Sequence, residues 1–466
     1  MDEKFDIVIY GAGPASLFFL EKFYNTNINI AIIDSGSFKE SENLNSIDNV
    51  TGPIKFFQGS NKEKAEGFFG TCKYWREKGV GGKLQKFDPS DFEENSWPFE
   101  YTKINKYYEL ALKIILNRTK LDLKKDFEIN SLPSFLKSFN NNFDLKAASS
   151  TLSYSFINLY DSIKKDFINC KNFSYFSNTK LSKFKINYEK KKIEFAECFN
   201  EKKKELKFFA KTHILSCGCL ENNRVILNSF SNKPEYIKNY NIGRYVSFHP
   251  SIGFGNYKFN KSLRLSHFKK KLNPKNKLIF LKSHKQKNFN SALNFSFSYY
   301  RSNNFFLNKT ILKYLNFIDQ IDFSLLIEHK PSFNSQITLS KNKSSNDLQK
   351  INIHTEFTNE NLDMVEKSKD YYYKVLKRTA ILEKHKFNFS NLDINYETDN
   401  HHHGGLLFGK KKEFPVNNDF SLKDFNNLYI NGSSIFPSSS IYGPTFTIIA
   451  CSLMLSDIIY NKLKIS

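Results

Sequence analysis

The stretch FDIVIYGAGPASLFFLEKF, residues 5–23, decides the fold of this chain. Residues 6–10 are mainly β-branched and apolar, as a buried parallel strand requires. Two glycines then interrupt the run, and residues 14–23 have the composition of a helix. The stretch therefore predicts a strand, a tight turn and a helix in succession.

Gly11, Gly13 and Ser16 occupy the positions of a G-x-G-x-x-[GAS] motif. The first glycine permits the tight turn, the second lets backbone approach a pyrophosphate, and a small third residue allows close helix–strand packing. A second apolar strand, NIAIIDSG, leads to Asp34, whose carboxylate would accept hydrogen bonds from ribose hydroxyls. The pattern predicts a dinucleotide site and does not separate FAD from NAD. An ordinary tight turn is the alternative.

Composition sets wider limits. The chain has 466 residues, of which 40% are hydrophobic and 16% aromatic, so we expect a large core and two domains. The net charge of +22 would attract anions, but the lysines are spread through the chain and Lys, Asn, Ile and Phe are abundant together, as AT-rich codons favour. No RNA-binding signature or zinc finger accompanies them, and we expect no nucleic-acid partner.

Compartment is indicated by the cysteines and by the N-terminus. Six cysteines without a C-x-x-C pair suit a reducing compartment. The first residues are acidic where a signal peptide needs basic ones. We expect no membrane span, because the best candidate, residues 442–460, contains Pro444 and Asp457. These features predict a soluble cytoplasmic protein; they leave the oligomeric state open.

Four later stretches lie in an informative order. They are THILSCGCLENNRVILNS (212–229), NIGRYVSFHP (241–250), HHHGGLLFG (401–409) and NNLYINGSSIFPSSSIYGPTFTIIACSLMLSDII (426–459). In this order they resemble the glucose–methanol–choline (GMC) oxidoreductases, which are FAD-dependent. The resemblance covers both ends and the middle of the chain and is poor between about residues 255 and 395. It implies a site assembled from segments far apart in the sequence.

A further segment, residues 68–111, is similar to one that passes the flavin ring in bacterial members of the family. A short insertion separates Trp75 from Gly81 here, so either Trp75 or Val80 is expected to face the ring. Some relatives attach the flavin through a histidine in this segment. Since no histidine occurs before His213, we expect FAD to be held without a covalent bond.

The implied fold class is α/β, with a Rossmann-type FAD-binding domain and an α+β substrate domain that contains an antiparallel sheet. Residues 1–250 and 396–466 would form the FAD-binding domain, and residues 251–395 the substrate domain. Residues 277–300 alternate like antiparallel strands, residues 359–385 have a helical pattern, and residues 183–215 are typical of a small antiparallel sheet with lysine-rich turns.

The resemblance also implies the site residues. Those expected to bind the cofactor are Gly11, Gly13, Pro14, Ala15, Ser16, Asp34, Ser35, Gly70, Thr71, Gly82, Lys83, Cys217, Gly218, Gly432, Ser433, Gly443, Pro444 and Thr445. The helix that begins after Pro444 would present its N-terminal amides to a reduced flavin.

The implied activity is oxidation of a primary or secondary alcohol, such as a sugar-like or polyol hydroxyl, to a carbonyl. His401 matches the histidine that removes the hydroxyl proton, and imidazole titrates near neutral pH. His402 is a second candidate for a catalytic or orienting role, whereas His249 is expected to be a packing or turn residue. A metal clamp, an affinity tag and a structural histidine run are the other interpretations of residues 401–403; consecutive residues converge poorly on one metal.

One position departs from the family pattern. Gly443 stands where the family has asparagine or a second histidine, which shares the substrate hydroxyl with the first. Tyr442, His402 or a group from the variable substrate domain could take over that role. The departure also leaves room for a flavin-dependent reductase or desaturase on the same scaffold, or for a non-catalytic binding protein. Neither the substrate nor the electron acceptor, oxygen or another, is identified by the sequence.

Overall fold

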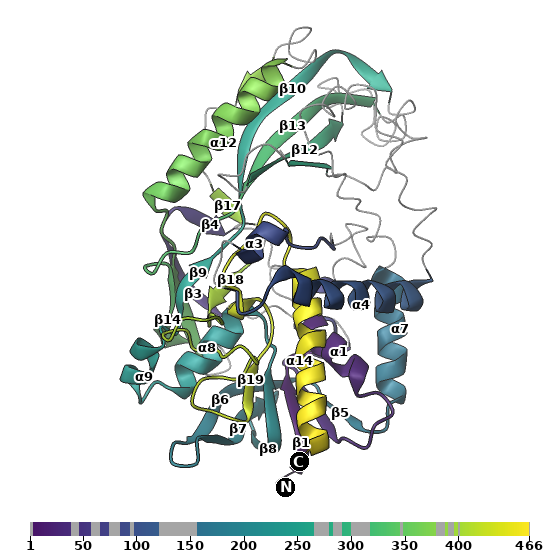
Figure 1. The fold of residues 1–466 in the computed structure, drawn as a ribbon, viewed down its shortest axis with the longest axis vertical. Helices are drawn as coiled ribbons and strands as arrows, with labels where there is room; N and C mark the ends of the chain where they lie inside the picture. The colour runs from purple at the N-terminus through teal and green to yellow at the C-terminus, as the bar shows by residue number, and fades with distance from the viewer. Residues whose placement is uncertain are drawn as a thin grey trace.

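The structure is a computed structural model. It describes residues 3–38, 46–56, 66–73, 84–93, 97–120, 156–264, 279–282, 291–299, 317–344, 348–378, 387–389, 396–398 and 401–465. Its strands form three sheets, and helices pack around them. The parallel sheet lies at the opposite end of the molecule from the long strands β10, β12 and β13 (Figure 1).

The first sheet has a parallel centre. Strand β1 (Glu3–Tyr10) lies between β2 (Ile30–Ile33) and β8 (Glu205–Leu215), and β5 (Phe173–Phe176) and β19 (Leu428–Ile430) extend it on either side. The side chains of residues 7–10 are buried on both faces, which is why the strand is apolar without alternation. The predicted strand–turn–helix is confirmed, and the fold is the predicted α/β type.

The first half of β8 also belongs to an antiparallel part of this sheet. It pairs antiparallel with β7 (Lys192–Asn200), which pairs antiparallel with β6 (Thr179–Asn187). The small antiparallel sheet predicted for residues 183–215 is therefore confirmed, and it is continuous with the parallel strands.

Helices from both ends of the chain cover the parallel strands. Helix α1 (Pro14–Phe19) packs against α14 (Thr445–Ile465), which also packs against α4 (Tyr101–Thr119), and α4 packs against α7 (Phe156–Asn169). Helix α8 (Cys219–Ser229) lies against β6. Shorter elements are η1 (Leu20–Lys22), η2 (Gly70–Cys72), α3 (Pro89–Glu93), α9 (Pro234–Asn239) and η5 (Ser433–Ile435).

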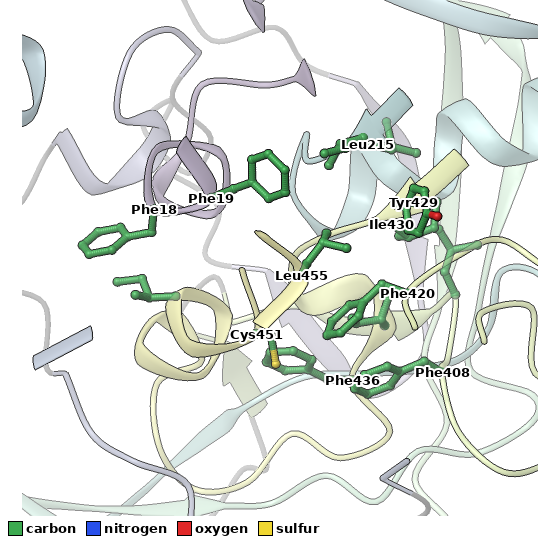
Figure 2. Close-up of a cluster of buried hydrophobic side chains, with 14 of the residues drawn as sticks. Phe18, Phe19, Leu215, Phe408, Phe420, Tyr429, Ile430, Phe436, Cys451 and Leu455 are labelled. Carbon is green, nitrogen blue, oxygen red and sulfur yellow. The ribbon is translucent and has the colours of Figure 1, made fainter. Parts of the chain in front are cut away.

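Helix α14 begins after Pro444, as predicted, and runs unbroken past Asp457. It is long and apolar enough to cross a membrane by length and composition, which corrects the expectation that no stretch would be, but most of it is buried inside the protein. Figure 2 shows the reason: Cys451 and Leu455 of α14 face a cluster of buried aromatic side chains. The cluster includes Phe18, Phe19, Phe408, Phe420, Tyr429 and Phe436. Burial of this apolar surface accounts for the composition of the helix.

The second sheet consists of long strands. Their order is β11 (Ile279–Lys282), β12 (Ser291–Tyr299), β13 (Phe317–Ile327), β10 (Pro250–Arg264), β17 (Tyr396–Thr398) and β4 (Ile54–Phe56), and β16 (Phe387–Phe389) also pairs with β10. Strands β11, β12 and β13 are antiparallel, and α12 (Asn359–Arg378) lies along them. The antiparallel strands and the helix predicted within residues 277–300 and 359–385 are confirmed.

The third sheet connects the other two. Its order is β18 (His403–Gly405), β9 (Arg244–Ser247), β14 (Gln336–Lys343), β15 (Gln349–His354) and β3 (Ile47–Thr51). Together with β4 and β17, these strands bring the first 60 residues and the segment after residue 395 into sheets built largely from residues 244–354. The domain boundaries at residues 250 and 395 stay a prediction.

A histidine lies inside the parallel sheet. His213 on β8 is fully buried, and its Nδ1 is 2.8 Å from the hydroxyl oxygen of Tyr10 on β1. Burial lowers the pKa of His213 to about 3, because a charged imidazolium would be desolvated there. The residue is therefore neutral in the folded protein at neutral pH.

This burial predicts a pH-dependent stability. The folded-state pKa of His213 lies below the unfolded value of about 6.5. The stability that neutral His213 contributes is therefore complete above about pH 6.5 and is lost as the pH falls, because only the unfolded chain takes up the proton. Between about pH 6.5 and about pH 5 the wild type should lose about 2 kcal/mol more unfolding free energy than a His213→Gln variant. Urea unfolding at both pH values measures this difference. An equal loss of unfolding free energy in the two proteins would contradict the prediction.

Candidate functional site

The glycine turn is built as the motif predicts. The N–H of Gly11 donates to the carbonyl oxygen of Ile33 at 2.7 Å, which joins β1 to β2 at their carboxyl ends. Gly11 has φ +95°, and a Cβ there would lie 2.5 Å from the carbonyl oxygen of Ser216, so only glycine fits. The Ser16 hydroxyl donates to the carbonyl oxygen of Gly11 at 2.5 Å. The small residue at position 16 therefore closes the turn as well as allowing close packing.

Asp34 holds three backbone turns together. Its carboxylate accepts N–H groups from Ala12 at 2.7 Å, Gly36 at 2.8 Å and Gly67 at 2.7 Å. Burial raises the pKa of this carboxyl group, although the three N–H donors act in the opposite direction. Ser35 lies in the turn that follows. The structure thus gives Asp34 a bracing role in addition to the ribose contact predicted for it.

The segment predicted to approach the flavin lies against this turn. The N–H of Phe69 donates to the carbonyl oxygen of Ala12 at 2.8 Å, and a Cβ on Gly70 would lie 3.3 Å from the Cα of Gly13. Thr71 follows Gly70 in η2. The other predicted residues of this segment, Trp75, Val80, Gly82 and Lys83, lie outside the described residues.

A buried asparagine joins three of the predicted motifs. The side-chain oxygen of Asn222 accepts the N–H of Cys217 at 2.8 Å, and its amide group donates to the Asn431 carbonyl oxygen at 3.0 Å and to the Ser434 hydroxyl at 2.9 Å. The Asn431 side chain in turn donates to the Ala15 carbonyl oxygen at 3.3 Å. Neither asparagine was predicted from the sequence; the available signal for Asn222 was an amide side chain in a helix most of whose residues are buried.

Three glycines border open space at one edge of the parallel sheet. Gly13, Gly218 and Gly432 follow the carboxyl ends of β1, β8 and β19, which are neighbours in the sheet. A Cβ on Gly13 or Gly218 would meet no atom within 4 Å, and one on Gly432 would meet only the Asn222 side chain, at 3.8 Å. Ligands of open α/β sheets bind outside this edge, where backbone is most accessible at glycine.

The histidine segment is attached to the same edge. The Ser433 hydroxyl donates to the carbonyl oxygen of His402 at 2.7 Å, and the Asn223 side chain donates to the carbonyl oxygen of Gly404 at 3.0 Å. The segments at residues 218, 432 and 401–404, which the resemblance placed in one site, are therefore brought together in the fold.

His401 contacts a second histidine. Strands β18 and β9 are antiparallel with His403 opposite Ser247, and this register continues outward to place His401 opposite His249. The Nδ1 atoms of His401 and His249 are 3.1 Å apart. His249 is buried, so the prediction of a packing residue was incomplete: it also forms a hydrogen bond with the candidate base.

The other two histidines of the run have different neighbours. The ring of His402 packs edge-on against Phe248, with 5.6 Å between ring centroids. His403 is fully buried beside Phe436, and burial, with the nearby His401, His249 and His402, holds its pKa well below the usual range. Among the described residues, no group of three or more His, Cys, Asp or Glu side chains is arranged to hold a metal ion.

The loop that carries Gly443 is anchored by buried acids. The Ser440 hydroxyl donates to Asp91 at 2.7 Å, and its N–H donates to Glu328 at 3.3 Å. The Trp97 indole N–H donates to the Ser438 hydroxyl at 3.3 Å. The loop then leads through Gly443 and Pro444 to Thr445, the first residue of α14. These acids were not predicted from the sequence, because each comes from a distant segment.

Comparison with known proteins gives one family match and several similar folds. Residues 331–452 match the family model described as GMC oxidoreductase. No curated protein sequence matches the chain. A formate oxidase variant from Aspergillus oryzae RIB40, made to study FAD modification, has a TM-score of 0.67 at 13% identity, over 100% of this chain and 99% of its own. Pyridoxine 4-oxidase from Mesorbium loti has a TM-score of 0.65 at 12% identity, over 97% and 98%.

At this level of identity the likeness to solved structures shows a shared fold. The fold is the predicted one, in which a Rossmann-type domain is joined to a second, largely antiparallel part. The resemblance drawn from the sequence is thereby confirmed: residues 331–452 match the GMC oxidoreductase family model, and the whole fold is similar to those of two oxidases.

Proposed function

We propose that this protein is an FAD-dependent oxidoreductase that oxidises the hydroxyl group of a small alcohol, of a sugar-like or polyol kind, to a carbonyl. The observation that carries the proposal is the convergence of three glycines bordering open space with the His401 segment at one edge of the parallel sheet. An oxidoreductase of this family needs both a dinucleotide cradle and a proton acceptor, and the chain supplies them side by side.

The residues at this edge fit a dinucleotide. Gly13, Gly218 and Gly432 leave backbone accessible where side chains would otherwise intervene. Asp34 fixes the turns on the adenosine side of the glycine motif. We propose non-covalent binding because no histidine precedes His213 in the chain. When bound, FAD would supply the two-electron oxidising chemistry that protein side chains lack.

The chain's own contribution to the reaction would be proton transfer. His401 would accept the proton of the substrate hydroxyl, a role for which imidazole is suited because this group titrates near neutral pH. His402 packs on Phe248 and would orient the segment through its carbonyl oxygen, which accepts the Ser433 hydroxyl. Gly443 has no side chain to share the hydroxyl, so the proton acceptor would come from the histidine segment alone.

Flavin binding is tested by two glycine variants. Gly13 has φ −77° and an open surrounding, so Gly13→Ala should fold with an unchanged melting temperature but bind FAD at least tenfold more weakly, a loss of about 1.4 kcal/mol. Gly11→Ala should lose both stability and binding, because its Cβ clashes with Ser216. Flavin absorbance and fluorescence titration of the apoprotein measure the affinity. A wild-type protein that takes up no FAD would contradict the proposal.

The role of His401 is tested by anaerobic flavin reduction. His401→Ala should keep the flavin and lower its reduction rate by about 10²–10⁴-fold, the usual contribution of a general base. His354→Ala is the matched control, since His354 lies on β15 and its Nδ1 bonds the Thr51 hydroxyl. Polyols, sugars, pyridoxine and formate are the probe substrates. An unchanged rate of flavin reduction in His401→Ala would show that His401 is not the general base.

Anaerobic flavin reduction also distinguishes alcohol oxidation from a second candidate function. Gly443 motivates a flavin-dependent reductase on this scaffold, because the usual second proton-sharing residue is missing there. Rapid bleaching of the flavin by NADH or NADPH, with none by the alcohol probes, would favour a reductase over an alcohol oxidase or dehydrogenase.

A further inference from the structure

Two neighbouring asparagines of helix α8 bind different parts of the site. The side chain of Asn222 bonds the two segments that carry cofactor glycines, as described above. The side chain of Asn223 donates instead to the carbonyl oxygen of Gly404, in the segment that carries His401. Successive residues of a helix point about 100° apart, so a single turn of α8 reaches both segments.

We propose that Asn223 is a positioning residue that sets the place of the His401 ring relative to the cofactor glycines. This inference rests on the proposed function of His401 as base. His401 lies two residues before the start of β18, so the place of its ring follows from where β18 is held. Proton transfer needs the reacting atoms within about 2.6–3.2 Å, and a misplacement of about 1 Å can lower a rate about 10²-fold.

The partners of the Asn223 amide fix its orientation. Its Nδ2 lies 3.0 Å from the carbonyl oxygen of Gly404 and 2.9 Å from that of Cys219. Carbonyl oxygens only accept hydrogen bonds, so the NH₂ group, and not the amide oxygen, faces both of them. The contact to Gly404 therefore has one direction, and it joins the main chain of α8 to that of β18 through one side chain.

The chain directly after His403 has no room for side chains. A Cβ on Gly405 would lie 2.1 Å from Oδ1 of Asn223, and a Cβ on Gly404 would lie 2.3 Å from the carbonyl oxygen of Tyr245 on β9. Both glycines have positive φ, +86° and +81°. Strand β18 is thus held between β9 and α8, and on the α8 side the contact is made by Asn223.

The helix itself does not explain an asparagine at this position. Asparagine is a poor helix former, and Asn223 lies inside α8 with its side chain fully buried. Its Oδ1 has no hydrogen-bond partner among the described residues, which is a cost of burial. Alanine would suit the helix better and avoid that cost. What alanine cannot supply is the bond to Gly404.

The first test compares variants of the two asparagines in the FAD-loaded protein. Asn223→Ala should bind FAD as tightly as the wild type and keep its KM, while the rate of anaerobic flavin reduction at saturating probe substrate falls about tenfold or more. Asn222→Ala should bind FAD about tenfold more weakly. Asn427→Ala is the matched control, because buried Asn427 donates to the Ile193 carbonyl oxygen at 3.0 Å and lies at the amino end of β19, away from the cofactor edge. It should lower only the melting temperature.

Three outcomes contradict the proposal. One is a wild-type rate of flavin reduction in folded Asn223→Ala. Another is a loss of FAD affinity as large as in Asn222→Ala, because the residue would then belong to the cofactor cradle. A third is a raised KM with an unchanged rate at saturation. Should Asn223→Ala not fold, Asn223→Ser takes its place, since a helical serine bonds the carbonyl oxygen four residues back, here Cys219, and leaves Gly404 without its donor.

Amide hydrogen exchange of the apoprotein tests the anchoring without flavin or substrate. In Asn223→Ala the exchange should rise in residues 401–405 and stay unchanged in residues 430–435, whereas Asn222→Ala should raise it in residues 430–435. Unchanged exchange in residues 401–405 of Asn223→Ala overturns the inference whatever the activity. A wild-type protein that takes up no FAD, or whose flavin no probe reduces, contradicts the proposed function and leaves the exchange pattern as it is.

Discussion

The side-chain amide of Asn222 is the interaction on which the arrangement of the site depends. It lies on the first turn of α8 and makes three hydrogen bonds, to the Cys217 backbone, the Asn431 backbone and the Ser434 hydroxyl. Each is worth about 1 kcal/mol net, but an unpaired buried group would cost about 1–3 kcal/mol, so the loss of any one of the three would destabilise this part of the fold. The edge of the sheet is thereby set by one residue from the middle of the chain.

Local features of this protein could be predicted from sequence because their causes are local. Gly11 is required by a positive φ, Pro444 precedes a helix that is apolar on most sides, and residues 277–300 alternate with a period of two. The resemblance added the set of segments that meet at the cofactor edge. Each of these signals lies within about twenty residues and needs no knowledge of the packing.

The parts of the fold and of the site that could not be predicted depend on contacts between distant residues. His249 and His401 are 152 residues apart, and their pairing follows from the register of β9 and β18, which no local pattern fixes. The same holds for Asp91 and Glu328, which meet at Ser440, and for β3, which joins a sheet formed mainly by residues 244–354. A histidine in the sequence FHP has the same local sequence whether it only packs in the core or also forms a hydrogen bond with a distant side chain.

The cover that α14 gives to α1 has a consequence for the timing of folding. Phe18 and Phe19 are synthesised more than four hundred residues before Cys451 and Leu455, which face their cluster. Strand β19 also joins the sheet only after more than four hundred residues. The N-terminal half therefore emerges from the ribosome with an apolar surface that it cannot cover by itself. A protein of this topology completes its core only after the segment that carries β19 and α14 has been made, and until then its exposed apolar surface favours aggregation.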